Sequence, residues 1–120
     1  MNLDKLNTEQ KRAVLHGNSP LLVLAGAGSG KTTVITYRIA HLIKTHQVWP
    51  NQILAVTFTN KAAKEMKERT LKLCEASQSQ PHIGTFHSIC VRILREFAQE
   101  VGLNKYFTIY NDSDRKQLLR

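Results

Sequence analysis

The chain has 120 residues, of which 42% are apolar and 22% are charged, and its formal net charge is +8. This length supports one modest hydrophobic core, so the sequence is one domain at most, or a piece of one. The longest apolar run, Leu21 to Ala27, is far shorter than the roughly 20 residues that a membrane-spanning helix needs. The apolar fraction and the absence of a dominant polar tract predict a globular protein rather than a disordered or fibrous chain. No secretory signal is visible in the first ten residues, so we expect a cytoplasmic location.

Charge is more informative than the cysteines and histidines. Two cysteines, Cys74 and Cys90, are too few for a disulfide framework, and the five histidines show no spacing typical of a zinc site. The basic excess is spread evenly, because each half of the chain carries +4. A polyanionic partner is therefore plausible on charge alone, although many small basic proteins bind none.

The first predicted elements are a helix and a buried strand. Asn7 followed three residues later by Gln10 resembles a capping box that opens a helix, which Gly17 and Pro20 would end. The run Leu21 to Ala25 is continuously apolar and lies between Pro20 and Gly26. This is the pattern of a strand buried on both faces of a parallel sheet.

Further strands and helices then alternate. The periodicity predicts helices from Lys31 to about Thr45, over 60–73 with Asn60 as the capping residue, and over 88–101 with Ile89, Ile93 and Phe97 facing inward. It predicts strands at 53–58, 82–86 and 106–110. Strands that alternate with helices pair in parallel through right-handed crossovers, so we expect an α/β sheet covered by helices on both faces.

The C-terminal end is predicted to open one more helix. Asp112 or Ser113 would cap it, and no stop signal precedes Arg120. We therefore expect a truncated sequence, with residues 1–111 in one domain and 112–120 at the start of a following helical segment.

The segment Ala25 to Thr32 has the composition of a phosphate-binding P-loop between a predicted strand and a predicted helix. Glycines let successive backbone N–H groups converge on a phosphate, and the following helix adds the positive end of its dipole. Lys31 would reach the β- and γ-phosphates, and Thr32 would place its hydroxyl on Mg²⁺. Ala25 stands where the strict pattern has Gly, and the alternative is a glycine-rich turn that only joins strand to helix.

Three further segments accompany the P-loop: Leu6-Asn7-x-x-Gln10, Val56 to Ala63, and Gly84 to Ser88. Together these motifs resemble the N-terminal segment of superfamily one DNA helicases of the UvrD, Rep and PcrA type, over nearly the whole chain. The resemblance implies a RecA-like P-loop NTPase fold and the activity of an ATP-dependent DNA helicase of the 3′–5′ type. It implies ATP and Mg²⁺ as cofactors, single-stranded DNA as partner, and further helicase domains in the same protein.

The resemblance also assigns residues to the nucleotide. Gln10 matches a glutamine that hydrogen-bonds the adenine edge, although without the family match a helix cap is its simpler role. Arg69 matches an arginine near the nucleotide, and Thr33 stands where the family commonly has Arg, so affinity or base selectivity is expected to differ. Lys31 and Thr32 would take part in catalysis, and Thr32 in metal binding. The whole nucleotide-binding set is Gln10, Ala25, Gly26, Ala27, Gly28, Ser29, Gly30, Lys31, Thr32, Thr33 and Arg69.

Two loops match DNA-contacting motifs of the family. An aromatic ring near the end of a strand can stack on any base, and a core ring under the helix is the alternative for Phe58. For His87, a structural histidine competes with a hydrogen-bond donor to DNA. The basic face formed by Lys64, Lys67 and Lys72 is read as a solvated helix surface. The residues expected at DNA are Phe58, Thr59, Asn60 and Lys61 in the first loop and Thr85, Phe86 and His87 in the second.

In the family, the Asp-Glu pair, the arginine fingers and the second RecA-like domain follow this segment, and none lies within these 120 residues. We therefore expect that the 120 residues alone do not hydrolyse ATP. Two alternatives stay open: the motor segment of a RecB-like or AddA-like helicase-nuclease, and a non-catalytic nucleotide- or DNA-binding fragment. A P-loop kinase is less favoured because no acceptor site or arginine-rich lid is found.

Overall fold

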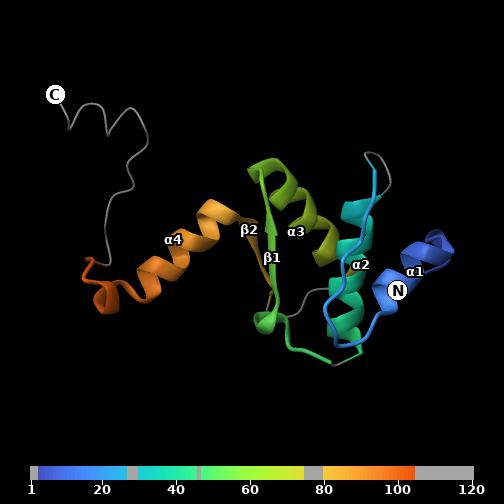
Figure 1. Cartoon of the computed structure of the whole chain (residues 1–120), viewed down its shortest axis with the longest axis horizontal. Coiled ribbons are helices and arrows are strands. Elements are labelled where there is room, and N and C mark those ends of the chain that lie inside the picture. Colours follow the sequence, from blue (N-terminus) through green and yellow to red (C-terminus); the bar gives the residue numbers. More distant parts are fainter. Residues whose placement is uncertain (1–2, 27–29, 46, 75–79, 105–120) are drawn as a thin grey trace. The chain divides into compact units, whose positions relative to one another are not determined.

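The computed structural model describes residues 3–26, 30–45, 47–74 and 80–104 (Figure 1). The chain divides into two compact units, Met1–Phe86 and His87–Arg120. The strand expected at 106–110 and the helix expected after Asp112 lie outside the described residues. Within the described ranges, no helix has the length and apolar character needed to cross a membrane.

The first unit begins with a short 3₁₀ turn, Leu3–Lys5, and helix α1, Thr8–Leu15. The predicted capping box is confirmed: the Gln10 backbone N–H donates to Asn7 Oδ1 at 2.8 Å, and the Asn7 N–H donates to Gln10 Oε1 at 3.0 Å. These two bonds satisfy amides that the first turn of a helix otherwise leaves unpaired. Helix α1 buries Ala13 and Val14 in an apolar cluster with Val34.

Helix α2, Lys31–Lys44, confirms the helix predicted after the glycine-rich segment. Its buried side chains face two ways. Val34 joins α1 in one apolar cluster, whereas Ile39 joins a second cluster with Ala55, Met66 and Ile83. Helix α2 therefore connects α1 to the sheet.

In the described residues the sheet has two strands, β1 (Leu54–Thr57) and β2 (His82–Thr85), joined by helix α3 (Asn60–Cys74). A 3₁₀ turn at Pro50–Gln52 precedes β1. The strands are parallel, and their register pairs Ala55 with Ile83. Ala55 and Ile83 pack against Ile39 of α2 and Met66 of α3, so both helices cover this face. On the other face Leu54 is 56% exposed. The predicted parallel pairing is confirmed in this part, whereas the predicted helical cover on both faces is found on one face of the sheet in the described residues.

The strand predicted at Leu21–Ala25 is wrong for this structure. The residues have no regular secondary structure, and Leu22 and Leu24 are 81% and 87% exposed. A strand needs a neighbouring backbone with which to form a hydrogen-bond ladder. Among the described residues, β1 and β2 form the sheet only with each other, so this apolar run has no ladder partner.

Helix α4, Phe86–Glu96, begins two residues before the predicted start and ends five before the predicted end. A separate 3₁₀ turn, Ala98–Val101, follows after Phe97, which has non-helical backbone angles. Ile89 is buried, as predicted, but Ile93 and Phe97 are 48% and 46% exposed, so their predicted inward orientation is wrong. The break at Phe97 ends the helical periodicity on which that prediction relied.

Candidate functional site

The first turn of α2 provides one half of the candidate site. Gly30 precedes the helix with φ of 79°, a left-handed conformation that favours glycine. A Cβ at Gly30 would lie 2.9 Å from Nε2 of Gln10. The amide of Gln10 is therefore packed directly against the start of α2, where unpaired backbone N–H groups create a positive helix end. Ala27, Gly28 and Ser29 lie outside the described residues.

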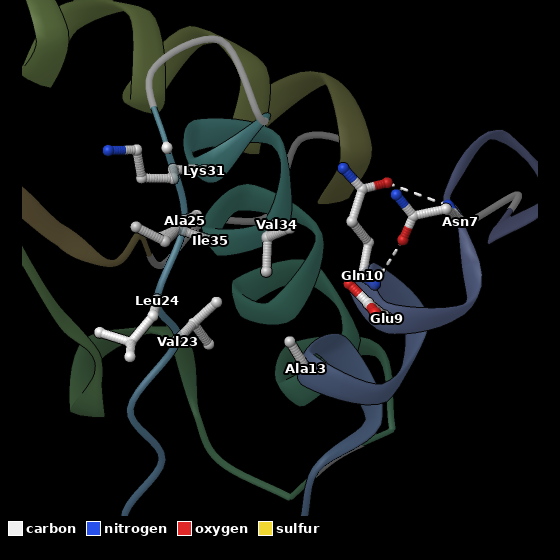
Figure 2. Close-up of a pocket in the computed structure, with 11 residues that line it drawn as sticks. Asn7, Glu9, Gln10, Ala13, Val23, Leu24, Ala25, Lys31, Val34 and Ile35 are labelled. Carbon is white, nitrogen blue, oxygen red and sulfur yellow. Dashed lines mark hydrogen bonds between the residues drawn. The ribbon is translucent and has the colours of Figure 1, made fainter.

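The side chain of Gln10 has a defined orientation. Its Oε1 accepts the Asn7 backbone N–H at 3.0 Å, so its Nε2 is the end that lies at Gly30. Figure 2 shows both bonds of the capping box. The helix-cap role considered for Gln10 is thus confirmed, and a base contact through Nε2 remains compatible with it because the cap uses Oε1 and the side-chain NH₂ group carries two N–H donors of its own.

A pocket of about 410 Å³ opens beside these groups (Figure 2). Its polar lining comes from Asn7, Glu9, Gln10 and Lys31, and the rest of its lining is Ala13, Val23, Leu24, Ala25, Gly26, Val34 and Ile35. Figure 2 shows Lys31 on one side of the residues drawn, with its ammonium end pointing outward, and Gln10 and Asn7 on the other side. Small-molecule sites typically combine apolar walls with a few polar groups in this way.

The threonines that follow Lys31 differ in the hydrogen bonds of their hydroxyl groups. Thr36 Oγ1 donates to the backbone carbonyls of Thr32 and Thr33 at 3.0 and 2.9 Å. The hydroxyl of Thr32 itself makes no hydrogen bond with the part of the chain that the structure describes. Mg²⁺ commonly keeps several waters and phosphate oxygens and takes one or two protein ligands, so a single hydroxyl on the first turn of α2 fits this ion.

In the part of the chain that the structure describes, no protein cage for a metal accompanies Thr32. Over the described ranges, no group of three or more His, Cys, Asp or Glu side chains is placed to hold an ion.

Lys31 is exposed at the helix start, and Arg69 is exposed on α3, where it makes no hydrogen bond or ion pair with described residues. Cys74, at the end of α3, is a free thiol whose burial raises its pKa, with a smaller opposing effect of Lys44.

Two aromatic rings define the other half of the candidate site. Phe58 follows β1 and Phe86 follows β2, directly after the register pair Thr57 and Thr85. Because the strands are parallel, their ends bring the rings together, with centroids 5.3 Å apart and planes tilted by 40°. Phe58 is 91% exposed and Phe86 is 53% exposed. The core-ring alternative for Phe58 is therefore wrong.

Thr59, rather than Asn60, caps helix α3. Thr59 Oγ1 accepts the Ala62 backbone N–H at 3.1 Å, and Thr57 Oγ1 donates to the Thr59 carbonyl at 3.0 Å. Asn60 is the first residue of the helix, so its predicted capping role is wrong. Asn60, Lys61 and His87 are exposed, whereas Thr85, also expected at DNA, is 8% exposed.

The two halves lie at one end of the first unit. Figure 1 shows the first turns of α2 and α3 at the end of the sheet toward which β1 runs. Ligands of open α/β sheets gather at the carboxyl ends of the strands. The arrangement can therefore present a positive helix end, a pocket with an amide and an ammonium group, and a pair of exposed rings on the same side of the sheet.

One residue with several contacts was not found by sequence reasoning. The guanidinium of Arg38 donates to four backbone carbonyls around the end of α1, at distances of 2.9 to 3.3 Å. Its only sequence signal is its position on α2, four residues after the buried Val34 and hence on the same helix face.

Comparison with known proteins defines the class. The family model of the UvrD/REP helicase N-terminal domain matches residues 6–120, so the chain belongs to this family. It is 50% identical over 118 residues to the ATP-dependent DNA helicase PcrA of Staphylococcus aureus. It is 53% identical over 119 residues to the ATP-dependent DNA helicase UvrD1 of Mycobacterium bovis. Each alignment covers 98% of this chain but only 16% and 15% of those relatives.

Proposed function

We propose that this chain forms the ATP-binding part, and part of the DNA-binding surface, of an ATP-dependent DNA helicase. The helicase translocates on single-stranded DNA in the 3′–5′ direction. In this proposal residues 1–111 belong to the first of two RecA-like domains, and residues 112–120 begin the following helical segment. Family membership and the names of the relatives support the helicase assignment, and the parallel β1–α3–β2 unit supports the RecA-like fold.

The nucleotide binds at the start of α2. The backbone of Ala25 to Gly30 surrounds the phosphates, Lys31 neutralises the β- and γ-phosphates, and the dipole of α2 adds positive potential. Gln10 donates from Nε2 to an acceptor on the adenine edge, for which its packing against Gly30 orients it. Thr33 and Arg69 flank the nucleotide without a direct role in the chemistry.

Thr32 is the metal-binding residue of this proposal. Its hydroxyl, on the first turn of α2, would hold Mg²⁺ beside the phosphates. When bound, Mg²⁺ supplies charge neutralisation of the β- and γ-phosphates. The ammonium group of Lys31 stabilises the negative charge that develops on these phosphates during hydrolysis, and this stabilisation requires no proton transfer.

Single-stranded DNA binds across the ends of β1 and β2. Bases stack on Phe58 and Phe86, which gives tolerance of sequence because every base has a π-face. The backbone N–H groups of Asn60 and Lys61, exposed residues in the first turn of α3, can donate to a phosphate, as can the O–H of Thr59. His87 donates a hydrogen bond to the DNA. Thr85 contributes by ending β2 so that Phe86 meets Phe58, because its own side chain is buried.

The ring pair is the observation that carries the nucleic-acid part of this proposal. The rings of Phe58 and Phe86 contact each other but remain 91% and 53% exposed. They therefore offer an apolar surface on which the flat face of a base can stack. The test is equilibrium binding of fluorescent oligothymidine to the intact protein, with and without a nonhydrolysable ATP analogue. We expect binding of both ligands, and failure to bind oligothymidine at low ionic strength would contradict the proposal.

Hydrolysis requires more than these residues provide. The 120 residues alone are expected to bind nucleotide without DNA-stimulated turnover, since the family's Asp-Glu pair and arginine fingers are not among them. A robust turnover by these residues, abolished by Lys31→Ala, would contradict this part of the proposal.

A further inference from the structure

The guanidinium of Arg38 lies at the C-terminal end of α1. Its Nη1 donates to the carbonyl oxygens of Ala13 at 3.0 Å, Val14 at 3.3 Å and His16 at 2.9 Å. Its Nη2 donates to the carbonyl of Gly17 at 3.3 Å. One side chain of α2 thus reaches four carbonyls at the end of a different helix.

The chemistry of this contact suits arginine. The last four carbonyls of a helix have no partner within the helix, and the C-terminal end carries the negative pole of its dipole. A guanidinium offers five N–H donors in a rigid fork and always carries its charge. Arg38 is half-buried, which limits the access of water that could replace these bonds. The contact therefore holds the end of α1 on α2 by directional bonds in addition to the apolar cluster around Val34.

The other end of α1 carries Gln10. Helix α1 has eight residues and is therefore about 12 Å long. Nε2 of Gln10 lies within 2.9 Å of where a Cβ on Gly30 would be, so the fit of Gln10 at the start of α2 is close. Because a helix of eight residues is a short rigid element, a shift at its C-terminal end would change the position of Gln10 relative to the first turn of α2.

We propose that Arg38 is a positioning residue for recognition of the nucleotide base, which acts by fixing α1 on α2 so that Gln10 meets the base edge. This inference rests on the proposed function. It assigns Arg38 no contact with the nucleotide and no role in holding the phosphates, which belongs to Lys31 and the start of α2. Loss of Arg38 should therefore weaken binding of the base and leave binding of the phosphates unchanged.

The test compares two ligands of the intact protein: ATP, and inorganic tripolyphosphate, which has the phosphates but no base. Their dissociation constants are measured for the unaltered protein and for Arg38→Ala, Gln10→Ala and the double variant. We expect Arg38→Ala to weaken ATP binding roughly three- to tenfold, the size of one lost hydrogen bond, with unchanged tripolyphosphate binding. In the Gln10→Ala background, Arg38→Ala should cause no further loss, because both substitutions remove the same contact.

Two more variants keep the test decisive. Arg38→Lys retains the charge but not the fork, and should weaken ATP binding by a smaller factor even if Arg38→Ala is unstable. Arg92→Ala removes an exposed arginine of α4 and should change neither ligand's affinity. Equal loss of ATP and tripolyphosphate binding in the Arg38 variants, or no loss of either, would overturn the inference.

Failure of the proposed function gives a different result. If the unaltered protein binds neither ligand, the nucleotide site itself is wrong. If ATP binds but Gln10→Ala leaves its affinity unchanged, the assigned role of Gln10 is wrong. If Gln10→Ala weakens ATP binding while Arg38→Ala and Arg38→Lys do not, only the inference on Arg38 is wrong.

Discussion

The proposed nucleotide site and the proposed nucleic-acid site of this molecule are built differently. Around Gln10, side chains and backbone are connected by hydrogen bonds, with Asn7 orienting the amide and Arg38 holding the helix that carries it. At the ends of β1 and β2, by contrast, Phe58 and Phe86 are exposed rings that contact each other. The first arrangement fixes the direction of a donor, whereas the second offers faces without directional bonds.

This difference matches what each partner requires. A single kind of nucleotide is distinguished by donors and acceptors at fixed positions, because a wrong edge leaves buried polar groups unpaired. A strand of any sequence is held by stacking and by contacts to its phosphates, which need little directional precision. Substitutions on the two sides should therefore affect different ligands, and each prediction below tests that separation.

The largest effect is expected at Lys31. Lys31→Ala removes the ammonium group proposed to stabilise charge on the phosphates, so ATP hydrolysis by the complete helicase, of which this chain is proposed to be a part, should fall on the order of 100-fold or more. Steady-state ATPase assays with saturating oligothymidine measure this. Lys44→Ala, at the far end of the same helix, is the matched control and should retain the original rate. A Lys31→Ala protein with normal turnover would exclude the nucleotide site described above.

The ring pair should give the next largest effect. Phe58→Ala and Phe86→Ala should each weaken oligothymidine binding roughly tenfold, the usual contribution of stacking on one base, while ATP affinity is unchanged. Trp49→Ala is the control, because Trp49 is also an exposed aromatic, 72% accessible, but precedes β1 at its opposite end. If neither Phe variant weakens binding, the DNA is held by the net positive charge alone, as in the non-catalytic alternative.

A pair of glycine substitutions separates backbone strain from the contact with Gln10. Gly30 and Gly102 have nearly equal positive φ values, 79° and 76°, but only Gly30 has a neighbour, Gln10 Nε2, in the place of a Cβ. Both substitutions by Ala should lower stability by about 1 kcal/mol. Only Gly30→Ala should also weaken ATP binding, by several-fold as measured by calorimetry, and it should weaken ATP binding more than tripolyphosphate binding because Gly30 also belongs to the proposed phosphate-binding backbone. Equal ATP affinity in the two variants would contradict the packing of Gln10 against α2.

The smallest effect is expected at Asn7. Asn7→Ala removes the Oδ1 acceptor that caps α1, which should lower the free energy of unfolding by about 1 kcal/mol. The backbone N–H of residue 7 still orients Gln10, so ATP affinity should change little. Asn7→Asp retains an acceptor and should recover most of the stability in denaturant unfolding. A large loss of ATP affinity in Asn7→Ala with unchanged stability would contradict this description.

The sequence predicts those features that depend on neighbouring residues. The capping box and the start of α2 at Lys31 are confirmed, and β1 and α3 lie within one residue of their predicted bounds, because caps, glycines and helical periodicity act within a few residues. The equally apolar runs at Leu21–Ala25 and Ile53–Phe58 differ in outcome, since only the second contains a strand with a partner in the described structure. Composition indicates a tendency to be buried but does not identify the partner.

For the candidate site, the sequence identified residue types better than their contacts. Thr59 and Asn60 both suit an N-cap, and only the hydrogen bond to Ala62 distinguishes them. The exposure of Phe58 depends on the meeting of two strands distant in sequence. Arg38 was missed because its four acceptors are backbone carbonyls more than twenty residues away, which carry no side-chain pattern.

The central claim is that a single strand of DNA lies on the rings at the ends of β1 and β2. Photocrosslinking tests it most directly, with an oligothymidine that contains 5-iododeoxyuridine, the intact protein, and mass spectrometry of the crosslinked peptides. We predict adducts at Phe58, Phe86 or their immediate neighbours, and the yield of these adducts should fall when unlabelled oligothymidine is added as a competitor. Adducts found only elsewhere, for example at Trp49, would contradict the account.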